Sequence, residues 1–388
     1  MTKLIGLSLF SNIGVAEAYL KDIGAEVAVA NELLEERARF YQEVYPETKM
    51  ICGDITNPAV YQEILSESVK KGVNFLIATP PCQGMSTAGK QNPNDIRNWL
   101  IVYAINMIQD LKPKFILLEN VPQQLKTRIV IDGEQIFIPD YIKKCLEKDY
   151  VIKNEIVSAL DYGVPQMRHR SIFLCVRKDI NINWTFLKEE EKHATVTLQE
   201  AIGHLPSVDP RIQGFSCSEQ LAYFPEFEIK RKAALSVSPW HYPPTHKLRH
   251  VEVMKYTPEG QSALNNPKHY PVKPDGQRIK GYDNTYKRQW WSKPGYTITT
   301  YNGAICSHDN VHPGRPIGKD ENGDNIYSDA RVLTIYELML VMSLPQDWGI
   351  PGWATDSLIR HAIGEGIPPL IIKTLFERLI MEIKNEEN

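Results

Sequence analysis

The chain has 388 residues, of which 43% are hydrophobic and 23% charged, a balance typical of a globular protein with two or three domains. No apolar run approaches the ~20 residues of a membrane span, and the start has no signal-peptide cleavage pattern. Six scattered cysteines without a C-x-x-C pair argue against a disulfide framework or a zinc site. We therefore expect a cytoplasmic, monomeric protein without a metal.

The net charge of −3 hides a basic segment. Between residues 230 and 293, thirteen Lys and Arg residues face four Asp and Glu residues, a local balance of +9 that leaves −12 for the rest. Histidines and aromatic residues are interleaved with these cations. The pattern indicates a nucleic-acid surface, and the alternative is a solvated basic face with some core aromatics.

The first half of the chain alternates strand and helix patterns, which predicts a parallel sheet with crossover helices. Helices are expected over 15–24 and 99–111. Strands are expected at 4–10, 26–32, 49–54, 74–79 and 115–120. Ligands of open α/β sheets bind outside the carboxyl ends of the strands. The residues at or just after those ends are Phe10, Glu32, Asp54, Cys82 and Glu119.

The turn "FSNIG" at 10–14 is a reduced glycine-rich loop, with Asn12 where a first glycine would be expected. Asn and Gly both tolerate left-handed backbone, so a tight turn remains feasible. Glu32 lies eighteen residues beyond Gly14, close to the ~20 at which an acid reaches a ribose hydroxyl. These features favour a nucleoside ligand over a plain turn with an exposed acid. No P-loop motif follows, which argues against ATP hydrolysis.

The stretch "ATPPCQGMSTAGK" at 78–90 places Cys82 after two prolines, at the end of a predicted buried strand. A packing cysteine usually lies within an apolar run, so this position indicates a displayed, reactive thiol. The polar, glycine-containing segment from Gln83 to about Asn98 is suited to a closing lid. Of the other cysteines, Cys217 is expected at the surface. Those expected in the core are Cys52, Cys145, Cys175 and Cys306.

Several motifs recur in the order seen in one enzyme family: "LFSNIG", "PPCQG", "ENV", "QMRHR", "RVLTIYE" and "IGEGIPP". Together they span nearly the whole chain, which resembles the prokaryotic DNA cytosine-5 methyltransferases. The resemblance implies a Rossmann-like class I methyltransferase sheet, mostly parallel with one antiparallel strand, and a smaller, irregular target-recognition domain. The implied boundaries are 1–185 for the catalytic domain, 186–325 for recognition and 326–388 for a segment that returns to the catalytic domain.

The resemblance also implies a mechanism in which a cytosine is flipped out of duplex DNA. Cys82 would attack C6 of the base, so that C5 can accept a methyl group, while Glu119 hydrogen-bonds at N3. Arg168, and secondarily Arg170, would orient the base through its O2. Taken alone, Glu119 could instead be a polar strand end, and the two arginines could be an exposed strand edge.

The implied methyl donor is S-adenosyl-L-methionine, which leaves S-adenosyl-L-homocysteine as product. Phe10 would pack on the adenine, Glu32 would bind the ribose, and Asp54 the adenine amino group. The other expected donor-site residues are Ser11, Ile13, Gly14, Ile55, Thr79, Pro80, Glu365 and Gly366. Glu365 stands where the family usually has asparagine. Its carboxylate is expected either near the donor's sulfonium or as a solvent-facing or helix-start cap.

By position, the basic segment is the recognition domain, with Thr297 and Thr299 in its scaffold. The expected DNA contacts are Gln83, Ser86, Arg249, Arg278, Lys287, Arg288 and Gln289. The setting could be a restriction–modification system with a cognate endonuclease, or an orphan methylase. An RNA methylase of the same fold and a non-catalytic DNA-binding relative are the alternative functions.

Overall fold

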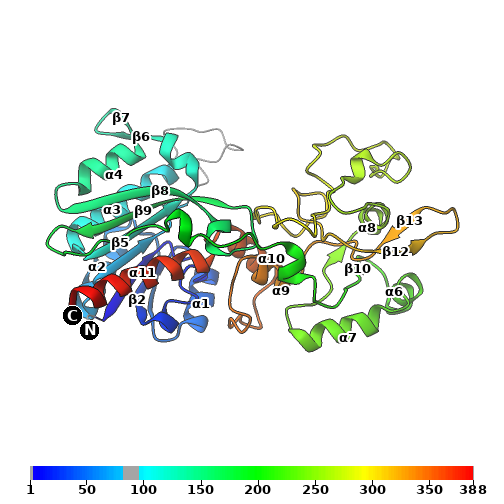
Figure 1. Cartoon of the computed structure of the whole chain (residues 1–388), viewed down its shortest axis with the longest axis horizontal. Coiled ribbons are helices and arrows are strands. Elements are labelled where there is room, and N and C mark those ends of the chain that lie inside the picture. The colour runs from blue at the N-terminus through cyan, green and yellow to red at the C-terminus, as the bar shows by residue number, and fades with distance from the viewer. Residues whose placement is uncertain (1–2, 82–95, 388) are drawn as a thin grey trace.

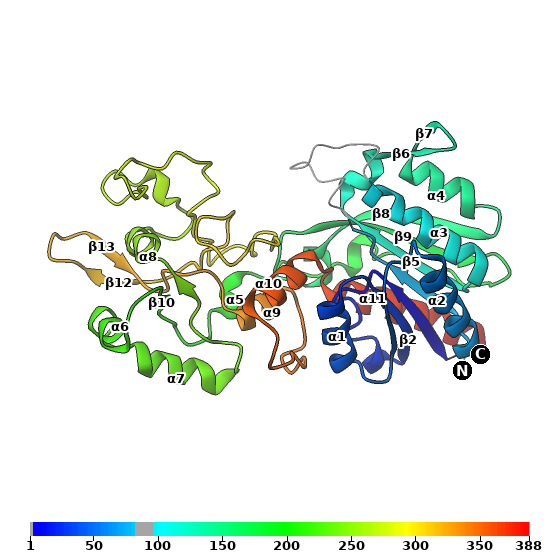
Figure 2. The same ribbon diagram turned by 180° about the vertical axis from the view of Figure 1, so that it is seen from behind.

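The computed structural model describes residues 3–81 and 96–387. It has two lobes joined by a middle layer of helices (Figure 1). One lobe is a sheet with helices on both faces, and it contains both chain ends. The other consists of short helices, small strands and long irregular connections, as the reverse view also shows (Figure 2).

The sheet has seven strands in the order β3-β2-β1-β4-β5-β9-β8. Strand β9 is antiparallel to both of its neighbours, and the other pairings are parallel, which confirms a mostly parallel sheet with one antiparallel strand. All five strands expected from the sequence form. The strands are β1 (Leu4–Leu9), β2 (Ala25–Glu32), β3 (Lys49–Cys52), β4 (Phe75–Ala78), β5 (Phe115–Asn120), β8 (Tyr150–Ser158) and β9 (His169–Arg177).

Helices cover both faces of this sheet. Leu4, Phe75 and Phe115 form one apolar core with the last helix, and the rings of Phe75 and Phe376 lie 5.0 Å apart. The C-terminal segment therefore returns to the first strand's side of the sheet, as expected. The opposite face packs on α2, α3 and α4. The helices of this lobe are α1 (Glu35–Val44), α2 (Pro58–Lys71), α3 (Leu100–Leu111), α4 (Ile138–Leu146) and α11 (Pro369–Glu387).

The helix expected over 15–24 does not form. The segment makes successive turns and one short 3₁₀ helix at Lys21–Ile23. Its backbone bonds span three residues, as from Leu20 N–H to the carbonyl of Glu17. Ser8 of β1 also donates a hydrogen bond to the buried carboxyl of Glu17. This tether to the sheet, within a short connection between adjacent strands, favours tight turns over a helix despite the apolar spacing.

The middle layer has its own apolar core, built from residues of both lobes. It contains α5 (Leu198–Ile202), α9 (Ile335–Val341) and α10 (Asp356–Glu365). The second lobe packs on a separate small core. Its elements are β10 (Arg211–Ile212), α6 (Cys217–Tyr223), α7 (Phe227–Val237), β11 (Thr245–His246), α8 (Leu248–Lys255), β12 (Pro316–Lys319) and β13 (Asn325–Tyr327). A hairpin, β6 (Arg128–Ile131) with β7 (Glu134–Phe137), extends the first lobe.

Within residues 3–81 and 96–387, no helix is both long and apolar enough to cross a bilayer, and no group of three His, Cys, Asp or Glu side chains could hold a metal. Cys175 is buried and Cys217 is exposed, as expected. Cys52 and Cys306 are exposed and Cys145 is half-buried, so their assignment to the core was wrong. Cys52, for example, ends edge strand β3, where the sheet offers no further neighbour to cover it.

A buried ion network ties α9 to the second lobe. Arg331 is fully buried and donates to both carboxylate oxygens of Glu337, at 2.7 and 2.9 Å, and to Asp329 at 2.8 Å. It also donates to the carbonyl of Val208 at 2.8 Å. Burial alone would raise the pKa of Glu337, but Arg331, with a smaller contribution from His312, holds it at about 2. Arg331 and Glu337 are therefore both ionised at neutral pH, and the single guanidinium is shared between two carboxylates.

Arg331→Met is expected to strand two buried carboxylates and to reduce the free energy of unfolding by about 3–5 kcal/mol at neutral pH. The native pKa of Glu337 is depressed, so its contribution is complete above its unfolded pKa and is lost as pH falls toward about 2. In the variant the stranded carboxylates take up protons, and the deficit should shrink at acid pH. Urea denaturation at neutral and acid pH measures both effects.

The matched control is Lys21→Met, which removes an exposed ion pair with Glu47. It should leave the denaturation midpoint unchanged. An Arg331→Met midpoint equal to that of the wild type would contradict a stabilising network.

Candidate active site

The carboxyl end of β5 holds two buried polar residues, Glu119 and Asn120. Asn120 Nδ2 donates to the carbonyl of Pro80 at 2.9 Å. The chain that leads toward Cys82 is therefore fastened beside Glu119. Three predicted site residues, Cys82, Gln83 and Ser86, lie outside the described residues.

Arg170 forms an ion pair with Glu119, with 2.7 Å between Nε and Oε1. Both side chains are about nine-tenths buried. Burial raises the pKa of Glu119, and the positive charges of Arg170 and Arg168 offset only part of that rise. The carboxyl thus keeps its proton to a higher pH than an exposed glutamic acid does, as a proton donor to a ring nitrogen needs.

Arg168 has a different environment. It is 1% exposed and donates to the carbonyls of Ile298 at 2.9 Å, Gly364 at 2.9 Å and Gly366 at 2.7 Å. Its guanidinium therefore holds the second-lobe connection and the C-terminal segment against the start of β9. Among the described contacts, Glu119 pairs with Arg170, and Arg168 instead binds backbone carbonyls of two other segments. This arrangement favours Arg170 over Arg168 as the candidate for orienting a base.

The loop at 10–14 makes the tight turn that its sequence allows. Phe10, Asn12 and Gly14 all adopt left-handed backbone, with φ of 59°, 51° and 84°. A Cβ on Gly14 would lie 2.1 Å from a ring carbon of Tyr45, so only glycine fits there. Ser11 is buried and its hydroxyl donates to the carbonyl of Asn31 at 3.0 Å, which fixes the loop to β2.

Glu32 lies at the end of β2, against this loop. Its two carboxylate oxygens accept hydrogen bonds from the backbone N–H groups of Asn12, at 2.9 Å, and Leu34, at 3.0 Å. Burial raises the pKa of Glu32, and the Leu34 N–H and the charge of Arg37 lower it. The carboxylate oxygens retain lone pairs that can accept ribose hydroxyls.

Two further donor-site candidates lie at neighbouring strand ends. Thr79 donates from Oγ1 to the carbonyl of Phe10 at 3.1 Å, so β4 and the loop share an edge. Asp54 is exposed and accepts from Thr56 N–H at 2.9 Å. Ile55, the next residue, is buried but forms part of the wall of a hollow of about 380 Å³.

The loop closes against the C-terminal segment. Ile13 is fully buried in the middle core, so only its backbone can face a ligand. A Cβ on Gly366 would lie 2.9 Å from Val15, and the glycine permits this close approach. Asn12 Oδ1 is buried without a hydrogen-bond partner among the described residues. Three features of this loop suit a nucleoside ligand that carries amino donors: the carboxylate of Glu32, the space left by Gly14, and the Asn12 acceptor that the described residues leave unpaired.

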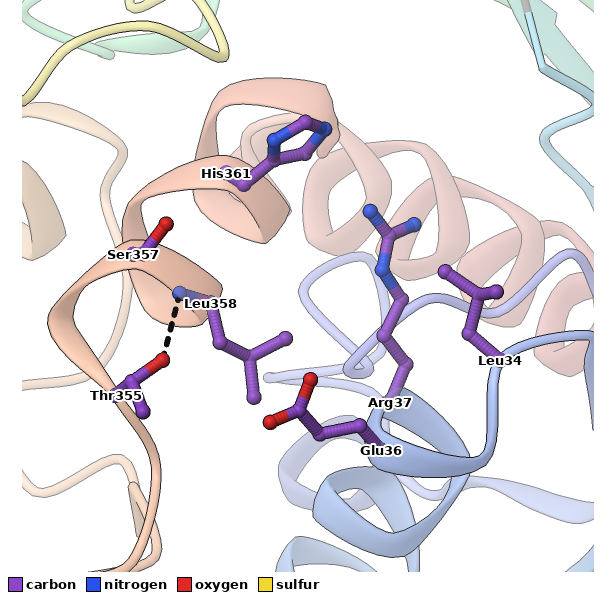
Figure 3. A pocket seen from close by; sticks show the side chains of 7 residues that line it. All are labelled: Leu34, Glu36, Arg37, Thr355, Ser357, Leu358 and His361. Atoms are coloured by element: carbon purple, nitrogen blue, oxygen red, sulfur yellow. Dashed lines mark hydrogen bonds between the residues drawn. The ribbon is translucent and has the colours of Figure 1, made fainter.

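Glu365 is the last residue of α10 and is only partly exposed, so it does not cap a helix start. Its carboxylate pairs with Arg37 at 2.7 Å and with His361 at 3.0 Å, and Asn12 Nδ2 lies 3.4 Å away. Arg37 and His361 come from α1 and α10 and lie toward each other across a hollow of about 260 Å³ (Figure 3). Sequence reasoning missed both: Glu365 is far from Arg37 in the chain, and its pairing with His361, one helical turn before it, depends on α10 forming there.

The DNA-contact candidates of the second lobe divide into two groups. Arg288 is fully buried and donates to four backbone carbonyls, and Gln289 is 3% exposed and accepts from Tyr296 N–H at 3.0 Å. Neither can reach DNA in this structure, which corrects both assignments. They form part of the scaffold because the lobe has few strands and uses side chains to satisfy its backbone carbonyls.

The other three candidates are at least partly exposed. Arg278 is exposed and lies over the Tyr270 ring, 4.1 Å from its centroid. Lys287 lies near two carboxylates, those of Asp283 at 3.4 Å and Asp309 at 3.8 Å. Arg249 is half-buried.

The two threonines of the expected scaffold differ in their contacts. Thr297 donates to the carbonyl of Met167, just before β9, and so links the second-lobe connection to the sheet. The carbonyl of Thr299 accepts locally from Asn302 Nδ2 at 2.6 Å.

Comparison with known proteins agrees with this arrangement. The family model for C-5 cytosine-specific DNA methylase matches residues 4–381. The chain is 42% identical to Type II methyltransferase M1.HgaI of Avibacterium volantium over 388 residues, 99% of each protein. It is 36% identical to Type II methyltransferase M.FnuDI of Fusobacterium nucleatum over 178 residues, 46% of this chain and 48% of that one.

Two solved structures share the fold across their whole length. One is described as a DNA modification methyltransferase encoded within an E. coli prophage, with a TM-score of 0.65, 19% identity and coverage of 98% of this chain and 99% of that one. The other is the Entamoeba histolytica methyltransferase EhMeth, with a TM-score of 0.60, 14% identity and 99% of each chain covered. These two structures share the fold. The family match over residues 4–381 and the identity with M1.HgaI show that the chain belongs to the C-5 cytosine-specific DNA methylase family and is a DNA cytosine-5 methyltransferase.

Proposed function

We propose that the chain transfers the methyl group of S-adenosylmethionine to C5 of a cytosine flipped out of duplex DNA, with Cys82, Glu119 and Arg170 as the catalytic residues. One observation carries this assignment. The Asn120–Pro80 hydrogen bond places the chain that leads to Cys82 beside the Glu119–Arg170 pair. A thiol two residues beyond Pro80 in sequence and a buried proton donor suit addition to a pyrimidine ring.

The chemistry assigns a task to each residue. C5 of cytosine is a poor nucleophile, so the Cys82 thiolate adds to C6 and the electron pair of the 5,6 double bond becomes available at C5. Glu119 donates a hydrogen bond or proton at N3, which takes up the negative charge of the addition. The donor supplies an electrophilic methyl group when bound. Loss of the C5 proton and elimination of the thiolate then restore the double bond.

Arg170 holds one carboxyl oxygen of Glu119 and leaves the other directed to a base. Its planar guanidinium has further N–H donors that can bind the O2 of cytosine. Arg168 affects the site indirectly, because its hydrogen bonds anchor the start of the strand on which Arg170 lies. We therefore assign Arg168 a structural role in the site.

The proposed donor site lies at the carboxyl ends of β1 to β4. Glu32 binds the ribose, Asp54 the adenine amino group, and Phe10 with Ile55 contacts the adenine. The methionine part lies against the remaining residues of the loop, β4 and the C-terminal segment. These are Ser11, the backbone of Ile13, Gly14, Thr79, Pro80 and Gly366.

We further propose that residues 1–185 and 326–388 form the catalytic unit and 186–325 the recognition domain. Arg249, Arg278 and Lys287 are the remaining DNA-contact candidates there, with Gln83 and Ser86 on the segment after Cys82. M1.HgaI is named a Type II methyltransferase, which supports a role in a restriction–modification system with a cognate endonuclease. Labelled methyl transfer to genomic DNA and to RNA, followed by sequencing of the modified sites, tests substrate and site together.

If Cys82 attacks C6, DNA with 5-fluorocytosine at the target should form an adduct that resists denaturation in the presence of donor. Fluorine cannot leave as a proton does, so elimination stalls. Cys82→Ala should abolish adduct and turnover but largely retain DNA binding, since phosphate contacts supply much of the affinity. Gel electrophoresis detects the adduct. Cys217→Ala removes an exposed thiol as a control and should leave it intact. Turnover in Cys82→Ala would refute the mechanism.

Glu119→Gln keeps the size of the side chain and an oxygen for Arg170 but cannot deliver a proton. The methyl-transfer rate constant should fall by ~10²–10⁴-fold. The wild-type rate should decline as pH rises through the pKa of Glu119, because the protonated acid is the active form, and the variant should lose this decline. Single-turnover rates across pH measure both effects. A wild-type pH profile in Glu119→Gln would contradict the assignment.

Arg278→Ala is expected to weaken DNA binding and to reduce the slope of log affinity against log salt by ~0.9, the value for one phosphate contact. Arg288→Met should instead lower the melting temperature, because it leaves buried carbonyls unsatisfied. Fluorescence anisotropy over a salt series and thermal melts separate the two. An unchanged slope of log affinity against log salt in Arg278→Ala would show that Arg278 does not contact a DNA phosphate.

A further inference from the structure

Helices α1 and α10 are joined by an ion pair beside the donor site. Arg37 Nη1 lies 2.7 Å from Glu365 Oε2, and the two side chains are 14% and 24% exposed. His361, one turn before Glu365 on α10, lies 3.0 Å from the other carboxylate oxygen. Figure 3 shows the Arg37 guanidinium directed toward His361 across the gap between the helices.

Asn12 connects the Arg37–Glu365 pair to Glu32, the proposed ribose acceptor. Asn12 Nδ2 donates to the carbonyl of Ala362 at 3.2 Å and lies 3.4 Å from Glu365 Oε2. The backbone N–H of Asn12 donates to Glu32 at 2.9 Å. A continuous path of polar contacts thus runs from Arg37 through Glu365 and Asn12 to Glu32.

The path contains Asn12, which stands where a loop glycine would be expected, and Glu365. The two side chains meet in the structure. The amide of Asn12 supplies a donor that glycine lacks, and the carboxylate of Glu365 accepts it.

We propose that Arg37 and Glu365 form a latch that positions Asn12 and Glu32 for the methyl donor and connects α10 to the donor loop. The inference rests on the proposed donor site and concerns positioning residues, which act through Asn12 and Glu32. It replaces a direct contact between Glu365 and the sulfonium.

Arg37 is required because Glu365 brings a second carboxylate close to Glu32. The charge of Glu365 raises the pKa of Glu32, in addition to the larger effect of burial, and the charge of Arg37 lowers it. Other titratable groups nearby are His361, which bonds Glu365, and the Cys52 thiol opposite Glu32 on β3. Burial, with the charges of Glu35 and Glu32, raises the pKa of Cys52, so the thiol stays neutral.

The latch predicts opposite effects for its two members. Glu32 accepts ribose hydroxyls as a carboxylate, so donor affinity is lost as pH falls through its pKa. Arg37→Met leaves two carboxylates facing each other and should move this loss to higher pH, with ~10-fold weaker binding at neutral pH. Glu365→Asn leaves Arg37 facing Glu32 alone and should move the loss to lower pH. The double variant should fall between the two.

Calorimetric titration of the full chain with S-adenosylmethionine and S-adenosylhomocysteine, from about pH 5 to about pH 9, measures these shifts. Both ligands should lose affinity equally in Arg37→Met, because the latch acts at the ribose. Each titration is repeated in a His361→Gln background, which removes the imidazole, and the order of the variants should persist. Arg39→Met, on the same helix and paired with Glu43, is the control and should bind as the wild type does.

The outcomes separate the latch from the donor site. If the wild type binds neither ligand, or if Glu32→Ala binds as the wild type does, the donor site itself is wrong. A different result would refute only the latch. In that case the wild type binds and Glu32→Ala does not, but Arg37→Met and Glu365→Asn shift the pH dependence in the same direction or leave it unchanged. Selective loss of the methyl donor over the product in Glu365→Asn would also refute it and restore a sulfonium contact.

Discussion

The structure depends on a buried guanidinium, that of Arg168, which binds the carbonyls of Ile298, Gly364 and Gly366. A buried cation is tolerated only if its donors are satisfied, so these carbonyls must remain in place around it. Three segments distant in sequence are held at one point: the start of β9, the connection from the second lobe, and the C-terminal segment. The positions of both candidate sites follow from this point.

Arg168 connects the candidate catalytic edge to the loop at 10–14. Arg170 lies two residues after it, on β9, and pairs with Glu119. In the other direction, Gly364 and Gly366 bring the C-terminal segment against the loop at 10–14, with Gly366 packed on Val15. One anchor thus fixes the proposed proton donor and one wall of the proposed donor site relative to each other, as methyl transfer between two bound molecules requires.

The second lobe uses much of its positive charge internally. Arg288 serves four backbone carbonyls, and Lys287 lies between two carboxylates. Lys230 and Arg231 are paired with acidic neighbours in the same way. A lobe with so few strands leaves many carbonyls unpaired by backbone, and long cationic side chains satisfy them. The basic count of the segment therefore overstates the charge that can face DNA.

Local sequence patterns predicted the strand ends, the polar residues placed on them and the thiol motif, because hydrophobic runs and turn residues act locally. Glu32 and Glu119 accordingly lie where they were expected. Only the tertiary contacts show that 15–24 turns without an α-helix, that Arg170 pairs with Glu119, that Arg288 is buried, and that Glu365 pairs with Arg37. The turns depend on the bond between Ser8 and Glu17, and the other three depend on partners far away in the chain. Neither local pattern nor residue type specifies which partner a buried charge will find.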